Sequence, residues 1–159
     1  MKEPRGQNGV TVSSNCDTNV NYNQGCGSSF SKANSYGAGF NKVGGGWFVL
    51  ERSAARGINV WFWARNDPSV PLAVSQGTKS IYPDDSWGRP EARFAPDTCA
   101  HSTYFDKHVM IFDTTFCGDW AGATFNSAGC PGNCNNYVNT NPDKFKEAYW
   151  EINSLRVYE

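Results

Sequence analysis

Two runs of aromatic and β-branched residues, separated by a short turn, constrain the fold of this chain more than any other feature. Trp47 to Arg52 and Ile58 to Trp63 each have the length and composition of a β-strand. The residues between them, Ala54 to Gly57, have the length and composition of a hairpin loop. The sequence therefore predicts an antiparallel hairpin over this stretch.

Three further segments have strand patterns. His108 to Phe116 gives the strongest pattern in the chain, and Glu151 to Tyr158 gives the last one. Prolines interrupt the middle of the sequence and leave room for a short strand at Glu91 to Phe94.

One short helix near the C-terminus is predicted, beginning at Pro142 and continuing through Lys144 to Tyr149. Asn141 can cap it, Pro142 occupies its first position, and Asp143 complements the helix dipole. Short strands, frequent turns and a single helix indicate an all-β fold, an antiparallel β-sandwich. We expect one domain over residues 1–159, loop-rich over 1–45 and strand-rich over 46–159.

The chain has an even number of cysteines in a loop-rich, charge-poor sequence, which indicates disulfides formed in an oxidising compartment. The six candidates are Cys16, Cys26, Cys99, Cys117, Cys130 and Cys134. Their spacing leaves the pairing open. A structural zinc site usually needs paired short spacings, and this chain offers a single C-x3-C, so we expect neither a metal nor a cofactor.

The net charge of −1, with no run of Lys or Arg, argues against nucleic acid or an acidic membrane as a partner. No apolar stretch approaches the roughly 18 residues of a membrane-spanning helix. The first residues, Met-Lys-Glu-Pro-Arg-Gly, are not followed by the apolar stretch of a secretory signal. Since the cysteines indicate secretion, we expect either that the true N-terminus lies upstream or that the chain is a fragment.

Several blocks are similar, in order and spacing, to the fungal laminarinase (endo-1,3(4)-β-glucanase) branch of glycoside hydrolase family 16. They are GGGWFVLER followed by INVWFWARN, then FCGDWAG (Phe116 to Gly122), GCPGNC (Gly129 to Cys134) and AYWEINSLRVY (Ala148 to Tyr158). The resemblance covers about Cys16 to Tyr158. It implies a concanavalin-like β-jelly roll of two curved antiparallel sheets, and a secreted enzyme that hydrolyses internal O-glycosyl bonds of β-glucans with retention.

The catalytic signature of that family, E-x-D-x-x-E on one strand, is absent from this sequence. Its outer glutamates act as nucleophile and acid/base, and retention requires their carboxyl groups to lie only about 5–5.5 Å apart. The nearest pair here, Glu147 and Glu151, has no Asp between its members. No catalytic residue can be assigned, and we expect the N-terminal half of the jelly roll to be missing. Such a chain should be poorly stable alone, or associate with that half or with itself.

Three residues are candidates for contact with β-glucan, the expected partner. Trp120 of FCGDWAG matches a cleft tryptophan that packs against a sugar in the family, and Asp119 beside it could bond to sugar hydroxyls. Trp87 could line the edge of the cleft or cap the sheet. For Trp120, too, packing in the core is the alternative, and for Trp47, Trp61, Trp63 and Trp150 core packing is the expectation.

Other acidic and histidine residues give weaker signals. Asp113 and Asp119 share strand parity but span on the order of 20 Å in an extended strand, too far to act on one bond. Asp84 and Asp85 are expected to be solvated turn residues, and the two histidines to lie in loops or on the surface.

Two classes of function therefore compete. One is the C-terminal part of an endo-β-glucanase domain, inactive alone. The alternative is a non-catalytic, lectin-like β-glucan-binding protein that retains the aromatic platform around Trp120.

Overall fold

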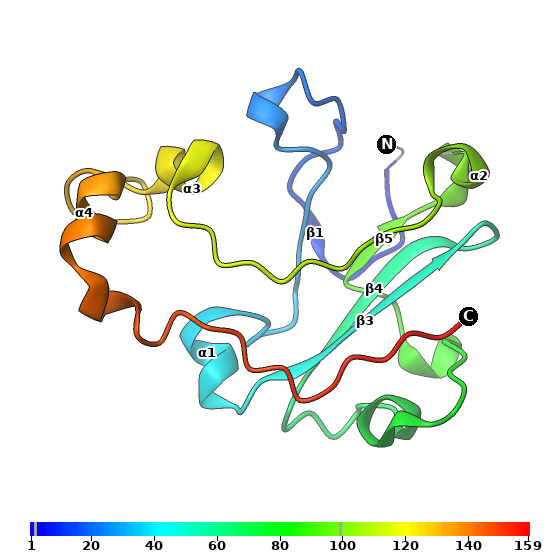
Figure 1. The fold of residues 1–159 in the computed structure, drawn as a ribbon. Coiled ribbons are helices and arrows are strands. Elements are labelled where there is room, and N and C mark those ends of the chain that lie inside the picture. The colour runs from blue at the N-terminus through cyan, green and yellow to red at the C-terminus, as the bar shows by residue number, and fades with distance from the viewer. Residues whose placement is uncertain (2, 99) are drawn as a thin grey trace. The chain divides into compact units, whose positions relative to one another are not determined.

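The computed structural model describes residue 1, residues 3–98 and residues 100–159. The chain forms two compact units (Figure 1). The first contains Met1–Lys107 with Tyr158–Glu159, and the second contains His108–Val157. Each unit is described by itself below.

The predicted hairpin is confirmed and forms the main sheet of the first unit. β3 (Gly46–Ser53) pairs antiparallel with β4 (Gly57–Ala64), and β4 pairs with β5 (Ala92–Phe94), which confirms the short strand expected there. Gly57 begins β4 at a φ of 77°, and a Cβ at this position would collide with the carbonyl oxygen of Phe94. Glycine is therefore required where the hairpin returns beside β5.

One face of this sheet carries the hydrophobic core. Trp47 lies opposite Trp63, and Val49 lies opposite Trp61, so the four side chains share a face. Trp61 and Trp63 are 3% and 2% exposed, which confirms the expected core packing. The side chains that cover this face come from the segment after β4, namely Val70, Val74, Ile81 and Trp87.

The other face of the hairpin is only partly covered. Phe48 and Phe62 lie opposite each other with ring centroids 4.8 Å apart, and Phe30 and Phe40 pack against both. Phe62 is buried as a result, but Phe48 remains 54% exposed. Further along the strand, Leu50 is 64% exposed.

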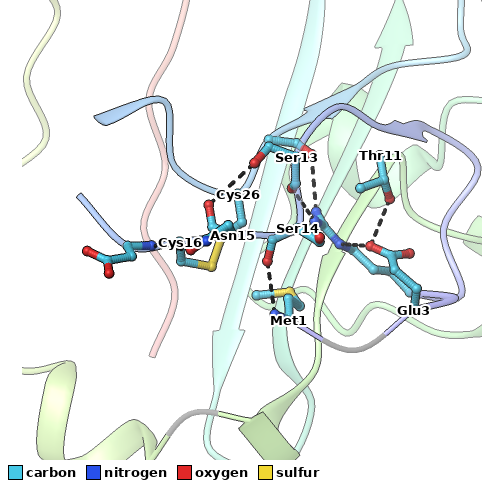
Figure 2. Close-up of a disulfide and its surroundings, with 11 residues drawn as sticks. Met1, Glu3, Thr11, Ser13, Ser14, Asn15, Cys16 and Cys26 are labelled. Carbon is cyan, nitrogen blue, oxygen red and sulfur yellow. Dashed lines mark hydrogen bonds and ion pairs between the residues drawn. A yellow bond between two sulfur atoms is a disulfide. The ribbon is translucent and has the colours of Figure 1, made fainter. Parts of the chain in front are cut away.

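The loop-rich N-terminal segment contains short elements that the sequence did not predict. β1 (Val10–Thr11) pairs antiparallel with β2 (Ser28–Ser29), and η1 (Asn21–Asn23) lies in the loop between them. A six-residue helix, α1 (Gly37–Lys42), precedes β3. The Cys16–Cys26 disulfide, drawn in Figure 2, closes the loop between β1 and β2.

A buried carboxylate attaches this segment to the sheet. Glu91, 1% exposed and adjacent to β5, accepts hydrogen bonds from the backbone N–H of Ser31 at 2.6 Å and of Lys32 at 3.2 Å, and from the Ser31 hydroxyl. The carbonyl oxygen of Glu91 accepts from the N–H of Gly9 at 3.0 Å and from the Ser28 hydroxyl. One residue therefore holds both strands of the β1–β2 ribbon.

A buried arginine completes this attachment. The Arg5 guanidinium lies over the ring of Phe94 and donates to the carbonyl oxygens of Ser13 and Gly27. It also pairs with Glu3 at 2.8 Å. The Glu3 carboxylate in turn accepts from the hydroxyl of Thr11 (Figure 2). The side chain of Arg5 is 1% exposed, and its charge is compensated by these partners.

The rest of the first unit consists of turns and short helices. They are η2 (Ala73–Gly77), η3 (Asp85–Trp87), η4 (Pro96–Thr98) and α2 (His101–Tyr104).

The second unit is built around two short helices. α3 (Gly118–Thr124) and α4 (Cys134–Thr140) are joined by the Cys117–Cys134 disulfide, and η5 (Pro142–Phe145) follows them. Four aromatic rings pack in this unit, with centroids 5.0–6.2 Å apart: Phe116, Phe125, Tyr137 and Phe145.

Two predicted strands and the predicted helix differ from the structure. Residues 108–116 and 151–158 form no strand and have no ladder partner among the described residues. A strand pattern alone does not form a strand, because the backbone groups need a neighbouring strand. The predicted helix begins at Pro142 as expected but ends at Phe145 as η5, and Asn141 caps it with its backbone only. A helix this short is marginal, because nucleation is unfavourable.

We predict that Glu91→Ala lowers the free energy of unfolding of the first unit by about 2 kcal/mol, because it leaves backbone donors without their buried acceptor. Denaturant unfolding followed by tryptophan fluorescence measures this change. Glu147→Ala is the matched control, since Glu147 is exposed and should change stability by less than about 0.5 kcal/mol. Equal unfolding midpoints for the two variants would contradict the anchoring role of Glu91.

Candidate functional site

Trp120 lies on the surface of the second unit. It belongs to α3 and is 67% exposed, so the alternative of core packing does not hold within this unit. Asp119 precedes it in the first turn of α3 and is also exposed. An exposed indole beside a carboxylate can stack on the apolar C–H face of a sugar ring and accept hydrogen bonds from its hydroxyls.

A hollow of about 550 Å³ lies beside the same helix. Gly118 and Gly122 line it from α3, one helical turn apart, so Trp120 lies between them in sequence on the opposite side of the helix. The remaining lining residues are mostly small or neutral and polar: Cys117, Phe125, Asn126, Gly132, Asn133, Cys134 and Asn135. The hollow and the Trp120 surface are thus two separate features.

Sequence reasoning did not single out the lining of this hollow. Its asparagines lie in the Gly- and Asn-rich stretch that was noted only for its cysteines, and no spacing rule connects them to a ligand. Asn133 is engaged in the fold, because its side-chain oxygen accepts from the Asn136 N–H at 3.2 Å and so caps α4.

The structure confirms disulfides at four of the six candidate cysteines, Cys16–Cys26 and Cys117–Cys134. Cys130 carries a free, exposed thiol. The remaining candidate, Cys99, lies outside the described residues. The Cys117–Cys134 disulfide ties the start of α3 to the start of α4, and it therefore positions both Trp120 and the hollow.

Trp87 caps the main sheet. Its ring packs edge-on against Trp61 and Trp63, with centroids 5.6 and 5.5 Å apart, and the indole N–H of Trp61 donates to the neighbouring Gly88 carbonyl at 3.1 Å. Trp87 belongs to the first unit and Trp120 to the second. Of the two alternatives for Trp87, the contacts support packing against the sheet.

Trp150 was expected in the core, but it is 60% exposed in the second unit. Its indole N–H donates to the Asp113 carbonyl at 2.9 Å, and its ring lies edge-on to Phe112. The expectation rested on a strand pattern, and the residues after Trp150 form no strand in the described structure.

Three aspartates, of which the sequence singled out Asp84 and Asp113 but not Asp67, serve local structure. Asp84 caps η3 by accepting from the N–H and hydroxyl of Ser86, and these bonds hold the pKa of Asp84 below its ordinary value. Burial raises the pKa of Asp67, but hydrogen bonds from Ser69 and Lys32 outweigh it and lower the pKa overall. Asp113 accepts from the Thr115 hydroxyl at 2.8 Å.

Metal ligands do not gather anywhere in the described part of the chain, where no group of three or more His, Cys, Asp and Glu side chains is close enough to hold an ion. His101 stacks on Phe105, with centroids 5.1 Å apart, and His108 is exposed. Among the described helices, none is long and apolar enough to cross a membrane.

Comparison with known proteins identifies relatives over nearly the whole chain. Residues 1–158 match the model of the XgeA-like, catalytic domain of glycoside hydrolase family 16. A probable glycosidase of Schizosaccharomyces pombe is 42% identical over 98% of this chain. The endo-1,3(4)-β-glucanase XgeA of Emericella nidulans is 37% identical over 80% of it.

Solved structures extend this similarity to the fold. Laminarinase 16A of Phanerochaete chrysosporium, described with β-glucans in its donor and acceptor sites, is 46% identical with a TM-score of 0.87. An elongating family 16 β-1,3-glucosyltransferase is 33% identical with a TM-score of 0.77. Both alignments cover 94% of this chain.

The chain spans only part of each relative: 50% of the laminarinase, 36% of the S. pombe glycosidase and 21% of XgeA. Several blocks of motifs, a family model over almost every residue and two similar solved structures nevertheless agree. The chain belongs to glycoside hydrolase family 16, in its XgeA-like branch.

Proposed function

We propose that this chain is the C-terminal part of a secreted endo-β-1,3(4)-glucanase-like jelly-roll domain, which hydrolyses internal bonds of β-glucans when it is complete. One observation carries the proposal. The chain superposes almost entirely on a laminarinase described with bound β-glucans, but accounts for only half of it. The disulfide Cys16–Cys26 and the disulfide Cys117–Cys134 support secretion.

The catalytic pair has to come from another segment. No E-x-D-x-x-E occurs in the sequence. The glutamates of the main sheet are engaged elsewhere: Glu91 is buried among backbone donors, and Glu51 pairs with Arg56 at 3.2 Å and accepts from the Asn59 amide. Neither is free to act as an exposed nucleophile or proton donor.

Two segments without regular structure favour assembly with a further β-layer. In residues 108–116, Val109 is 86% exposed and Ile111 80%, and in the last segment Val157 is 67% exposed. Such apolar residues, with high β-propensity and no ladder partner, are unfavourable in water and favour pairing with a neighbouring strand. The hairpin face that carries Phe48 and Leu50 is also partly exposed, and a further β-layer that covered it would be favourable for the same reason.

Glucan contact is assigned to the surface around Trp120, with Asp119 as a polar partner. Trp87 is not included, because its ring packs on the sheet. The same surface supports the second candidate function, a non-catalytic β-glucan-binding protein. It is favoured by an exposed tryptophan in a chain that has no catalytic motif.

We expect this chain to form a complex with the complementary N-terminal half of a family 16 laminarinase and to restore glucan hydrolysis. Co-expression followed by size-exclusion chromatography and a reducing-sugar assay on laminarin measures both effects. A complementary half with its two motif glutamates changed to glutamine is the control, and it should assemble without activity. A complex that forms but stays inactive would contradict the enzyme proposal and favour the binding protein.

We further predict that Trp120→Ala weakens binding to insoluble β-1,3-glucan by about tenfold, because the stacking surface is lost. Trp120→Phe should retain part of the affinity. Sedimentation with curdlan particles measures the bound fraction. Trp150→Ala removes a second exposed tryptophan and serves as the control, so an equal loss in both variants would show non-specific adsorption and refute the assignment.

A further inference from the structure

The loop closed by the Cys16–Cys26 disulfide has an unusual tip. Asn21, Tyr22 and Asn23 follow one another with φ values of 52°, 54° and 61°. This left-handed region is tolerated by asparagine but is unfavourable for a bulky aromatic residue. Figure 1 shows the loop, in blue, projecting from β1 within the first unit.

Hydrogen bonds among the residues next to the tip hold it in this conformation. The Asp17 carboxylate accepts from the N–H and the amide of Asn19, both at 2.9 Å. The carbonyl oxygen of Asp17 accepts from the N–H of Val20, and that of Asn21 accepts from the N–H of Gln24, both at 3.1 Å. With the disulfide, these bonds stabilise the strained turn at the tip of the loop.

The side chain of Tyr22 contributes nothing to this arrangement. It is fully exposed, at 106%, and its ring and hydroxyl contact no described residue. A glycine at this position would adopt the same backbone angles without strain and would leave no aromatic ring in water. The folding of the loop therefore does not account for a tyrosine at its tip, and strained residues of this kind concentrate at binding sites.

The chemistry around Tyr22 selects one class of ligand. Amide side chains flank it on both sides, at Asn21 and Asn23, and Asp17 is the one charged residue from Cys16 to Cys26. A phenol ring offers a flat apolar face to the C–H groups of a pyranose, and amides donate to and accept from its hydroxyls. An anionic ligand would find no cation in this loop.

We propose that the disulfide-closed loop 16–26 is an auxiliary contact for neutral β-glucan, in which Tyr22 stacks on a sugar ring and the two flanking asparagines bond to its hydroxyls. This contact is additional to the Trp120 surface, and it rests on the proposed function because it assumes that the protein binds β-glucan. Its fixed, pre-ordered geometry reduces the entropy lost on binding.

The test is sedimentation of the full chain with curdlan particles, together with thermal melting of each variant. Tyr22→Ala should weaken binding by about fivefold, and Tyr22→Phe should bind like the parent. Tyr22→Gly should melt at a higher temperature while binding more weakly, a combination that a purely structural residue would not give. Tyr82→Ala is the matched control, since Tyr82 is 80% exposed and should be neutral.

The outcomes separate the two proposals. If Tyr22→Ala binds like the parent while Trp120→Ala is weakened, the loop has no role in glucan binding and the proposed function stands. If the parent chain itself does not sediment with curdlan, the loop proposal and the assignment of glucan contact to Trp120 both fail, and the complementation assay alone decides the enzyme proposal. If Tyr82→Ala is weakened as much as Tyr22→Ala, binding is a general effect of exposed aromatics and the loop assignment is wrong.

Discussion

The buried carboxylate of Glu91 is the interaction on which the attachment of the N-terminal segment to the main sheet depends. Glu91 lies immediately before β5 and connects the sheet to a long segment with little regular structure. Such a segment buries too little apolar surface to be ordered by packing alone. The hydrogen bonds to Ser31, Lys32 and Gly9, with those of Arg5, therefore hold the ribbon that carries the Cys16–Cys26 loop.

The parts of the fold that could be predicted from the sequence are those determined by neighbours in the chain. The β3–β4 hairpin was predicted because its alternating aromatic residues and its turn are contiguous. The strand patterns at 108–116 and 151–158 were just as clear, but whether they form strands depends on a partner distant in sequence or outside the chain. A local pattern cannot supply that information.

In the candidate site, too, features determined by neighbouring residues could be predicted and contacts between distant segments could not. The FCGDWAG block was sufficient to select Trp120, and the structure adds that its indole is exposed. It could not be predicted that Trp87 packs edge-on against two tryptophans, because these contacts join segments separated by a proline-rich stretch. Tyr22 gave no sequence signal, since a left-handed backbone at a tyrosine is visible only in the structure.

We propose that this family 16 chain binds β-glucan through exposed aromatics and that the catalytic pair lies in another segment. The most direct test is to incubate the purified chain with laminarin and to measure reducing ends over time, in parallel with curdlan binding. The account predicts binding with no release of reducing ends above a buffer control. Release of laminari-oligosaccharides by the chain alone would contradict it, because a nucleophile and an acid would then lie within these residues.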